Sequence, residues 1–253
     1  MQRLIARPLT AWLVVAALAV AAIAYSSIRD TNPAINNVAC TGYGYGYGYG
    51  YGYGYGYGNA ALSLTLAPTS TTAGRSVRLA GMLTQNGCPV PGATINLQKR
   101  AVVNGVPSGP FATFGTRHTG PNGGYSLRGV FLTNKQFRAV SVAEAGRPSA
   151  TSNLVGLTVH TKISLKLAHL SGCRVRFTGS TLPTKANRRI SIQRHRAAGW
   201  RTAYHARTHS NGKYRVRHRL TCGKTYRFRS VIAGDSVNAS GRSASHRVKA
   251  RRH

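Results

Sequence analysis

The later half of the chain alternates between cationic side chains and side chains that are mostly apolar or aromatic. In KYRVRHRL, one set of alternate positions is Lys213, Arg215, Arg217 and Arg219, and the other is Tyr214, Val216, His218 and Leu220. The same period of two recurs in RVRF, with Arg174 and Arg176 on the cationic side, and in RFR, with Arg227 and Arg229 there. Because successive side chains of a strand point to opposite faces, the pattern predicts strands with one dry face and one cationic, solvent-exposed face.

Turn sequences separate these predicted strands. Asn86-Gly87, Pro121-Asn122-Gly123 and Ser210-Asn211-Gly212 are typical of tight reversals of the chain. No stretch after residue 30 shows the period of about 3.6 residues that an amphipathic helix requires. We therefore predict an all-β fold built from short strands.

An internal repeat divides the later part of the chain into two units. Four segments of the first unit recur in the second, namely SVRLAGML (76–83) as RVRFTGST (174–181), TINLQKR (94–100) as RISIQRH (189–195), FATFGTRHTGPNGGYSL (111–127) as WRTAYHARTHSNGKYRV (200–216), and TNKQFRA (133–139) as CGKTYRF (222–228). Units of this length, with short strands and regular turns, predict two tandem β-sandwiches at 60–160 and 161–249. A basic tail follows at 250–253.

The motifs of these units resemble a known family. The succession AGRSVRLAG, GATINLQKR, YRF and AGDSVNASGRSAS is similar to the Ig-like repeats of exported bacterial surface proteins and to the carboxypeptidase-regulatory-like group. The resemblance implies small Ig-like sandwiches that serve as a stalk, spacer or adhesive module without catalysis. The first unit departs from the AGDSVNAS ending, where it has AEAGRPSATSN.

The N-terminal segment predicts export. Arg3 and Arg7 precede an uncharged run from Pro8 to Ile28, which fits a hydrophobic helix in a signal peptide or an N-terminal membrane anchor at 1–28. Both alternatives place the remainder of the chain at the cell surface or outside the cell. Residues 29–59 predict a disordered linker, whose Tyr-Gly alternation is either a flexible spacer or an aromatic tract for association.

The cysteines follow the repeat. The alignment places Cys173 opposite Arg75 and Cys222 opposite Thr133, so the second unit has both cysteines and the first has neither. Two cysteines that occur together in one unit and are both missing from the other predict a Cys173–Cys222 disulfide. Export would place the chain in an oxidising compartment, where this bond can form. The alternative is two buried thiols. Cys88 is open to pairing with Cys40 or with another chain.

Composition excludes several kinds of chemistry. The chain has 35 Lys and Arg against 3 Asp and Glu, a formal net charge of +32. A site with paired catalytic carboxylates or a carboxylate-rich cation site is therefore not expected. His205 and His209 would lie roughly 13 Å apart on a strand, too far to share a metal. We predict no catalytic residues, no metal site and no cofactor.

The positive charge is concentrated in the second unit. Residues 60–160 hold 9 basic residues and 1 acid (9 − 1 = +8), whereas 161–253 hold 23 and 1 (23 − 1 = +22). We predict that a polyanion binds at Arg174, Arg176, Lys213, Arg215, Arg217, Arg219, Arg227 and Arg229. The expected partners are anionic cell-envelope polymers or extracellular polyanions, held without sequence readout, and the membrane through the N-terminal segment. The alternative is a passive spacer or adhesion stalk whose charge is incidental.

Overall fold

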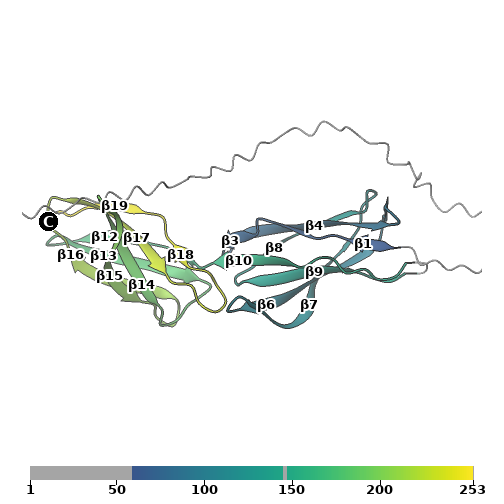
Figure 1. Ribbon diagram of the computed structural model, residues 1–253. Helices are drawn as coiled ribbons and strands as arrows, with labels where there is room; N and C mark the ends of the chain where they lie inside the picture. The colour runs from purple at the N-terminus through teal and green to yellow at the C-terminus, as the bar shows by residue number, and fades with distance from the viewer. Residues whose placement is uncertain (1–58, 145–146, 253) are drawn as a thin grey trace, which may run out of the picture. The chain divides into compact units, whose positions relative to one another are not determined.

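The computed structural model describes residues 59–144 and 147–252, which fold into two β-sandwich modules (Figure 1). The first module contains strands β1 to β10, and the second contains β11 to β19. In this described part of the chain, no helix has the length and apolarity needed to cross a membrane. The predicted leader at 1–28 and the Tyr-Gly tract at 43–58 lie outside the described residues.

The first module is built from two sheets. In one sheet β4 pairs with β1, β2, β5 and β8, and the strands are β1 Ala60–Leu62, β2 Thr65–Ala67, β4 Ser76–Gln85, β5 Cys88–Pro89 and β8 Gly124–Val130. The other sheet has the order β3-β10-β9-β6-β7, and its strands are β3 Ser70–Thr72, β6 Thr94–Val103, β7 Val106–His118, β9 Lys135–Ser141 and β10 Val155–His160. The last strand therefore forms even though the AGDSVNAS ending is missing from this module.

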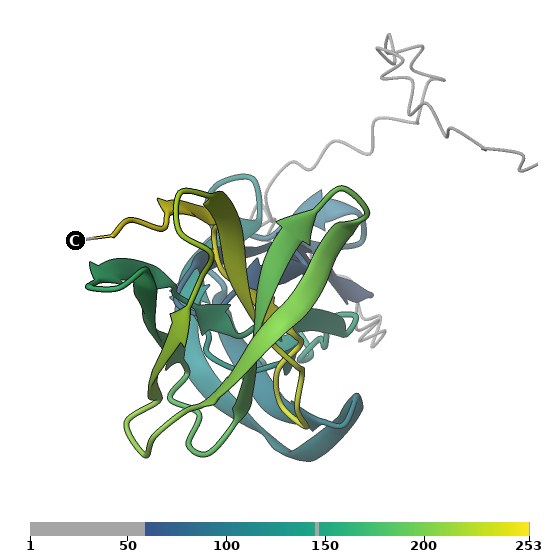
Figure 2. The ribbon, with the colours of Figure 1, turned by 90° about the vertical axis from the view of Figure 1, so that its left-hand side faces the viewer.

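The second module repeats this arrangement (Figures 1 and 2). In one sheet β13 pairs with β11, β12 and β16, and the strands are β11 Lys162–Ile163, β12 Lys166–Leu170, β13 Arg174–Leu182 and β16 Lys213–Arg219. The other sheet has the order β15-β14-β17-β18 with β19 also on β17, and its strands are β14 Arg189–Arg196, β15 Gly199–Arg207, β17 Thr225–Ile232, β18 Gly241–Arg242 and β19 His246–Lys249.

The strand order is that of an immunoglobulin-type sandwich. In the usual lettering, one sheet of each module is A-B-E, with β4 and β13 as strand B. The other sheet is C′-C-F-G, with β9 and β17 as strand F. In the first module β3 adds a parallel pairing to β10, as an A′ strand does beside strand G. The prediction of all-β, Ig-like sandwiches is therefore confirmed for the described residues.

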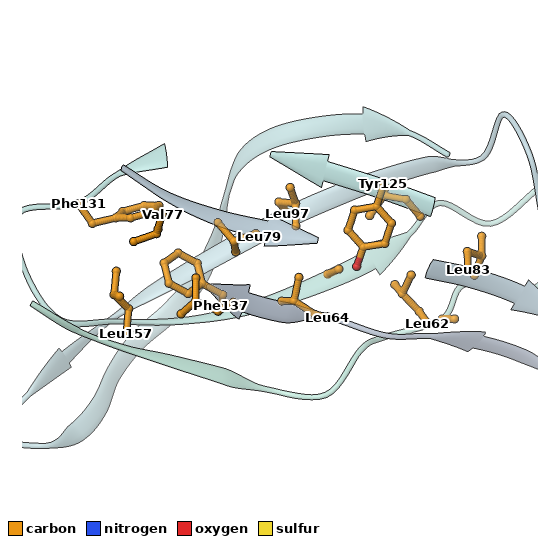
Figure 3. Close-up of a cluster of buried hydrophobic side chains, with 14 of the residues drawn as sticks. Leu62, Leu64, Val77, Leu79, Leu83, Leu97, Tyr125, Phe131, Phe137 and Leu157 are labelled. Carbon is orange, nitrogen blue, oxygen red and sulfur yellow. The ribbon is translucent and has the colours of Figure 1, made fainter. Parts of the chain in front are cut away.

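Each core forms where the apolar sides of the two sheets meet. In the first module Val77 and Leu79 from β4 pack against Phe137 from β9, and all three are nearly inaccessible to solvent (Figure 3). Phe137 also meets Phe131 edge-on, with ring centroids 4.9 Å apart. Burial of these side chains follows the alternation in sequence, because every second residue of a half-buried strand points into the sandwich.

A glycine–tyrosine pair occupies the same place in both modules. Gly81 on β4 lies opposite Tyr125 on β8, and Gly179 on β13 lies opposite Tyr214 on β16. Any side chain at either glycine would collide with the tyrosine ring and with a backbone carbonyl. The tyrosine hydroxyl donates to the Ser63 carbonyl at 2.5 Å in the first module, and to the Ser164 carbonyl at 2.6 Å in the second. This contact explains why both residues recur in the repeat.

One part of the sequence alignment of the repeat is wrong. Tyr125 and Tyr214 fix a shift of 214 − 125 = 89 residues in strand E, as expected. In strand F, however, Arg138 pairs with Gln98 and Arg229 with Gln193, which fixes a shift of 229 − 138 = 91. The chain between the tyrosine of strand E and the arginine of strand F is thus two residues longer in the second module, and Cys222 lies within this longer stretch rather than opposite Thr133. A slip of two residues keeps every side chain on its face, so alternation could not reveal it.

The predicted disulfide between Cys173 and Cys222 is confirmed, with Cα atoms 5.4 Å apart. Cys173 directly precedes strand B and Cys222 precedes strand F, so the bond joins the two sheets, as the B–F disulfide of antibody domains does. Closing a loop of 49 residues stabilises the folded state by about 4 kcal/mol in the chain-entropy model. The pairing proposed for Cys40 stays a prediction, because Cys40 lies outside the described residues.

Candidate anion-binding surfaces

Six of the eight predicted anion-binding residues lie on the A-B-E sheet of the second module. They are Arg174, Arg176, Lys213, Arg215, Arg217 and Arg219, and we call them the β13–β16 basic face. All are exposed except Arg176, which is half-buried. Their neighbours Val175, Phe177 and Tyr214 are buried. The predicted division into a dry and a cationic face is therefore confirmed on these strands.

The basic face places like charges directly opposite each other. Arg174 pairs with Arg219, and Arg176 pairs with Arg217, in the register of β13 and β16. Cross-strand pairs of like charge destabilise a sheet. The corresponding pairs of the first module are Ser76 with Val130 and Arg78 with Arg128. The scaffold therefore does not require the additional charge.

The acidic residues do not neutralise this face. Glu144 forms an ion pair with Arg147 at 2.7 Å, and Asp235 forms one with Lys185 at 2.7 Å. Asp30, the third acid of the sequence, lies outside the described residues. Within 59–144 and 147–252, then, both carboxylates are engaged by cations that do not belong to the basic face.

The two remaining predicted residues, Arg227 and Arg229, lie on the other sheet. They are on β17, which pairs with β14, whereas the basic face lies on β13 and β16. Arg227 is exposed and Arg229 is half-buried, so both side chains lie on the outer side of their strand, as expected. The eight residues therefore belong to two sheets and do not form one continuous row.

An aromatic ring organises the second surface. The guanidinium carbon of Arg229 lies 4.3 Å from the ring centroid of Trp200, and that of Arg227 lies 5.8 Å from it. Arg229 Nε donates to Gln193 Oε1 at 2.8 Å, and Arg227 Nε donates to Ser245 Oγ at 2.8 Å. We call these five residues the Trp200 cluster. Burial, followed by repulsion from Arg242, lowers the pKa of Arg229.

Sequence reasoning missed several cations around this cluster. Arg247 is exposed and directly opposite Arg227, and Arg242 is exposed and opposite Val231 on the neighbouring stretch of β17. Both come from the short strands β18 and β19, which have no long alternating run to attract notice. The match of Trp200 with Phe111 in the repeat was the signal that could have identified the cluster.

The histidines that the structure describes do not gather into a metal site. His205 lies beside Arg189, with Arg189 Nε 3.1 Å from His205 Nδ1. His218 stacks on Tyr204 with ring centroids 3.6 Å apart, and burial lowers the pKa of His218. Over residues 59–144 and 147–252, no three His, Cys, Asp or Glu side chains are grouped as metal ligands would be.

No protein-family model matches this chain, and the comparison with curated proteins gives no match. Among solved structures, the chain is similar to a tetra-tandem repeat in the extending region of a large adhesion protein, at 18% identity and a TM-score of 0.34, covering 76% of this chain and 50% of that one.

Two further solved structures are adhesins or parts of adhesins. One is a C-terminal 282-residue fragment of intimin in complex with the intimin-binding domain of its translocated receptor, at 12% identity, a TM-score of 0.36, and coverage of 75% and 63%. The other is the Yersinia pseudotuberculosis adhesin InvE, at 16% identity, a TM-score of 0.31, and coverage of 75% and 61%. Values this low do not bear on function, so the fold assignment comes from the strand order. The similarity to the carboxypeptidase-regulatory-like group stays a prediction.

Proposed function

We propose that this chain is a non-enzymatic, exported surface protein whose second module binds anionic polymers. One observation carries the proposal: the outer face of strands B and E is densely cationic in the second module and mostly neutral in the first. Both modules have the same strand order and the same Gly-Tyr pair. The additional charge therefore contributes nothing that the fold needs.

The basic face costs the second module stability in the absence of a partner. Its directly opposed arginines repel each other, and the module as a whole is strongly cationic. A bound polyanion would offset this repulsion. It would also gain entropy, because the counterions condensed on the polymer are released when cations of the protein replace them.

Export is supported by two independent features. The basic flank and uncharged run of residues 1–28 fit a leader or an anchor. The Cys173–Cys222 disulfide fits an oxidising compartment, since such bonds are rare where thiols are kept reduced. A role at the cell surface, including adhesion through anionic polymers, is the function that agrees with both features.

The test is a salt titration of polyanion binding. The full chain is bound to immobilised heparin, as a soluble model polyanion, across increasing NaCl concentrations. We expect the triple variant Arg215→Gln, Arg217→Gln and Arg219→Gln to bind at least about tenfold more weakly. Its slope of log K against log salt should also be shallower by roughly 2–3, because about one counterion is released for each cation.

A graft provides the matched gain of function. Introducing Ser76→Arg, Ser126→Arg and Val130→Arg places a similar row of cations on strands B and E of the first module. We expect this variant to bind heparin more tightly than the wild type. Binding that withstands 1 M NaCl, or that is equal in all three proteins, would contradict the proposal.

A further inference from the structure

The Trp200 cluster has a counterpart in the first module. Phe111 occupies the position of Trp200, and the guanidinium carbons of Arg100 and Arg138 lie 4.5 and 4.3 Å from its ring centroid. Arg138 Nε donates to Gln98 Oε1 at 2.8 Å, as Arg229 does to Gln193. Each module therefore carries two guanidinium groups against one aromatic ring on the outer side of its C′-C-F-G sheet.

The two modules assemble this arrangement from different residues. In the first module the second guanidinium comes from strand C, where Arg100 Nε donates to Gln136 Oε1 at 2.7 Å. In the second module it comes from strand F, where Arg227 stands at the position that corresponds to Gln136. The ring in each module is half-buried on an outer face and does not belong to the core. The geometry is thus kept while the residues change.

The cluster holds its guanidinium groups in fixed orientations. The Nε hydrogen bonds to Gln193 and Ser245 and the contact with Trp200 restrain both arginines before any ligand arrives. In the part of the chain that the structure describes, no acceptor bonds to the Nη groups of Arg227 or Arg229. These are the donors with which arginine binds oxyanions at two points.

From this geometry we infer that the Trp200 cluster is a specific site for phosphodiester groups of a polyol-phosphate polymer. The inference deepens the proposed function, on which it rests. A phosphodiester fits because its two unshared oxygens point in different directions, so two guanidinium groups can each bind one. Arg242 and Arg247 add charge nearby without a carboxylate partner in the described residues.

The ring contact argues against nucleic acid as the partner. Proteins that bind single strands without sequence preference stack bases on exposed aromatic faces. Here Arg229 lies over the ring, 4.3 Å from the centroid of Trp200, so the ring face that Arg229 covers is not open to a base. Recognition would therefore come from the phosphates alone, and a polymer without bases meets that requirement.

The experiment uses the full chain with Trp12→Phe, so that Trp200 is the sole tryptophan and its fluorescence reports on the cluster. The probe is poly(glycerol phosphate), and binding is also measured by calorimetry. We expect the probe to change Trp200 fluorescence in a saturable manner. Arg227→Gln with Arg229→Gln should weaken binding about tenfold. Gln193→Ala, which keeps the net charge but releases Arg229, should weaken it about threefold.

Lys162→Gln with Lys166→Gln is the control, because it removes the same charge from exposed positions of the other sheet, outside both proposed surfaces, and should preserve the Trp200 response. If the wild type binds no polyanion, the proposed function fails. If it binds but the two double variants lose equal affinity and Gln193→Ala has no effect, the Trp200 site alone fails. Single-stranded DNA with as many phosphates as the probe is also compared. If it binds tenfold more tightly than the probe, bases contribute to binding and the proposed site is overturned. Thermal melts establish that each variant is folded.

Discussion

The two modules share a backbone plan but differ in what they place on it. Both have strands A-B-E facing C′-C-F-G, and both bury a tyrosine over a glycine between strands B and E. On the outer side of these strands, Ser76 and Val130 in the first module stand where Arg174 and Arg219 stand in the second. The difference shows that the inner and outer faces of this fold are under separate constraints.

The interiors differ as well. The first module has one apolar cluster that spans both sheets and contains Phe131 and Phe137. The second module divides its buried residues into two clusters, one around Phe177 and one around Ile190. The disulfide Cys173–Cys222 joins the sheets beside the first of these clusters. The disulfide therefore links the two sheets of a module whose buried residues form two separate clusters.

The largest effect is expected from removing the Cys173–Cys222 disulfide, because this change should destabilise the second module and not the first. Cys173→Ala with Cys222→Ala should lower the free energy of unfolding of the second module by about 4 kcal/mol, because the unfolded chain regains loop entropy. For a domain of this size the midpoint should fall by roughly 15–30 °C. Trp200 fluorescence in a Trp12→Phe background follows the second module during thermal unfolding.

The same variant should leave the first module unchanged. A matched reporter for that module is Phe111→Trp combined with Trp200→Phe and Trp12→Phe, which moves the tryptophan to the corresponding position. A second module that melts within a few degrees of the wild type would show that the disulfide adds little to its stability.

A smaller loss of stability is expected from changing the Gly-Tyr pair that both modules share. Gly81→Ala and Gly179→Ala should each destabilise their own module by about 1–3 kcal/mol, because the new methyl group collides with a carbonyl and a tyrosine ring. The control is Gly156→Ala on β10, where a methyl group meets nothing within 4 Å. Two unequal losses, measured with the two tryptophan reporters, would mean that the Gly-Tyr pairs are not equivalent.

The smallest effect concerns alkaline pH. Burial raises the pKa of Tyr214 to about 12, and the Ser230 hydroxyl, whose oxygen lies 2.7 Å away and can donate to the phenolate, partly opposes this shift. A raised pKa in the folded state means that the neutral tyrosine is favoured there. Its contribution is therefore complete below pH ~10 and is lost between pH ~10 and about 12.

Tyr214→Phe isolates this contribution, because phenylalanine cannot ionise. We expect the variant to be about 1 kcal/mol less stable at pH 7, since it loses the hydrogen bonds to Ser164 and Ser230. Above pH 10 its stability should fall less steeply than that of the wild type. Parallel pH profiles of the two proteins, measured by chemical denaturation, would exclude Tyr214 as the titrating group.

Much of the fold could be predicted from local patterns. Alternation placed Val175 and Phe177 inside and Arg215 and Arg217 outside, because a strand has only two faces. The repeat indicated two modules, and the joint presence of Cys173 and Cys222 indicated their bond. The alignment of strand F failed, since a two-residue slip preserves the alternation that the comparison used.

The candidate site was predicted only in part. Arg227 and Arg229 were identified as outward-facing cations, but their contact with Trp200 and their hydrogen bonds to Gln193 and Ser245 were not. Those partners come from strands β14 and β15 and from the residue before β19. Their distances along the chain are large, and no local pattern links them.

The sequence by itself determined which alternate residues of each strand point into the core, that the charge is concentrated in the second module, and which two cysteines form its disulfide. Only the tertiary structure decided which sheet each cationic strand joins, and so which arginines share a surface. The physical reason is that side-chain alternation is a property of a single strand. Sheet membership is set by hydrogen bonds to strands far away in sequence, such as β17 to β14 and β16 to β13.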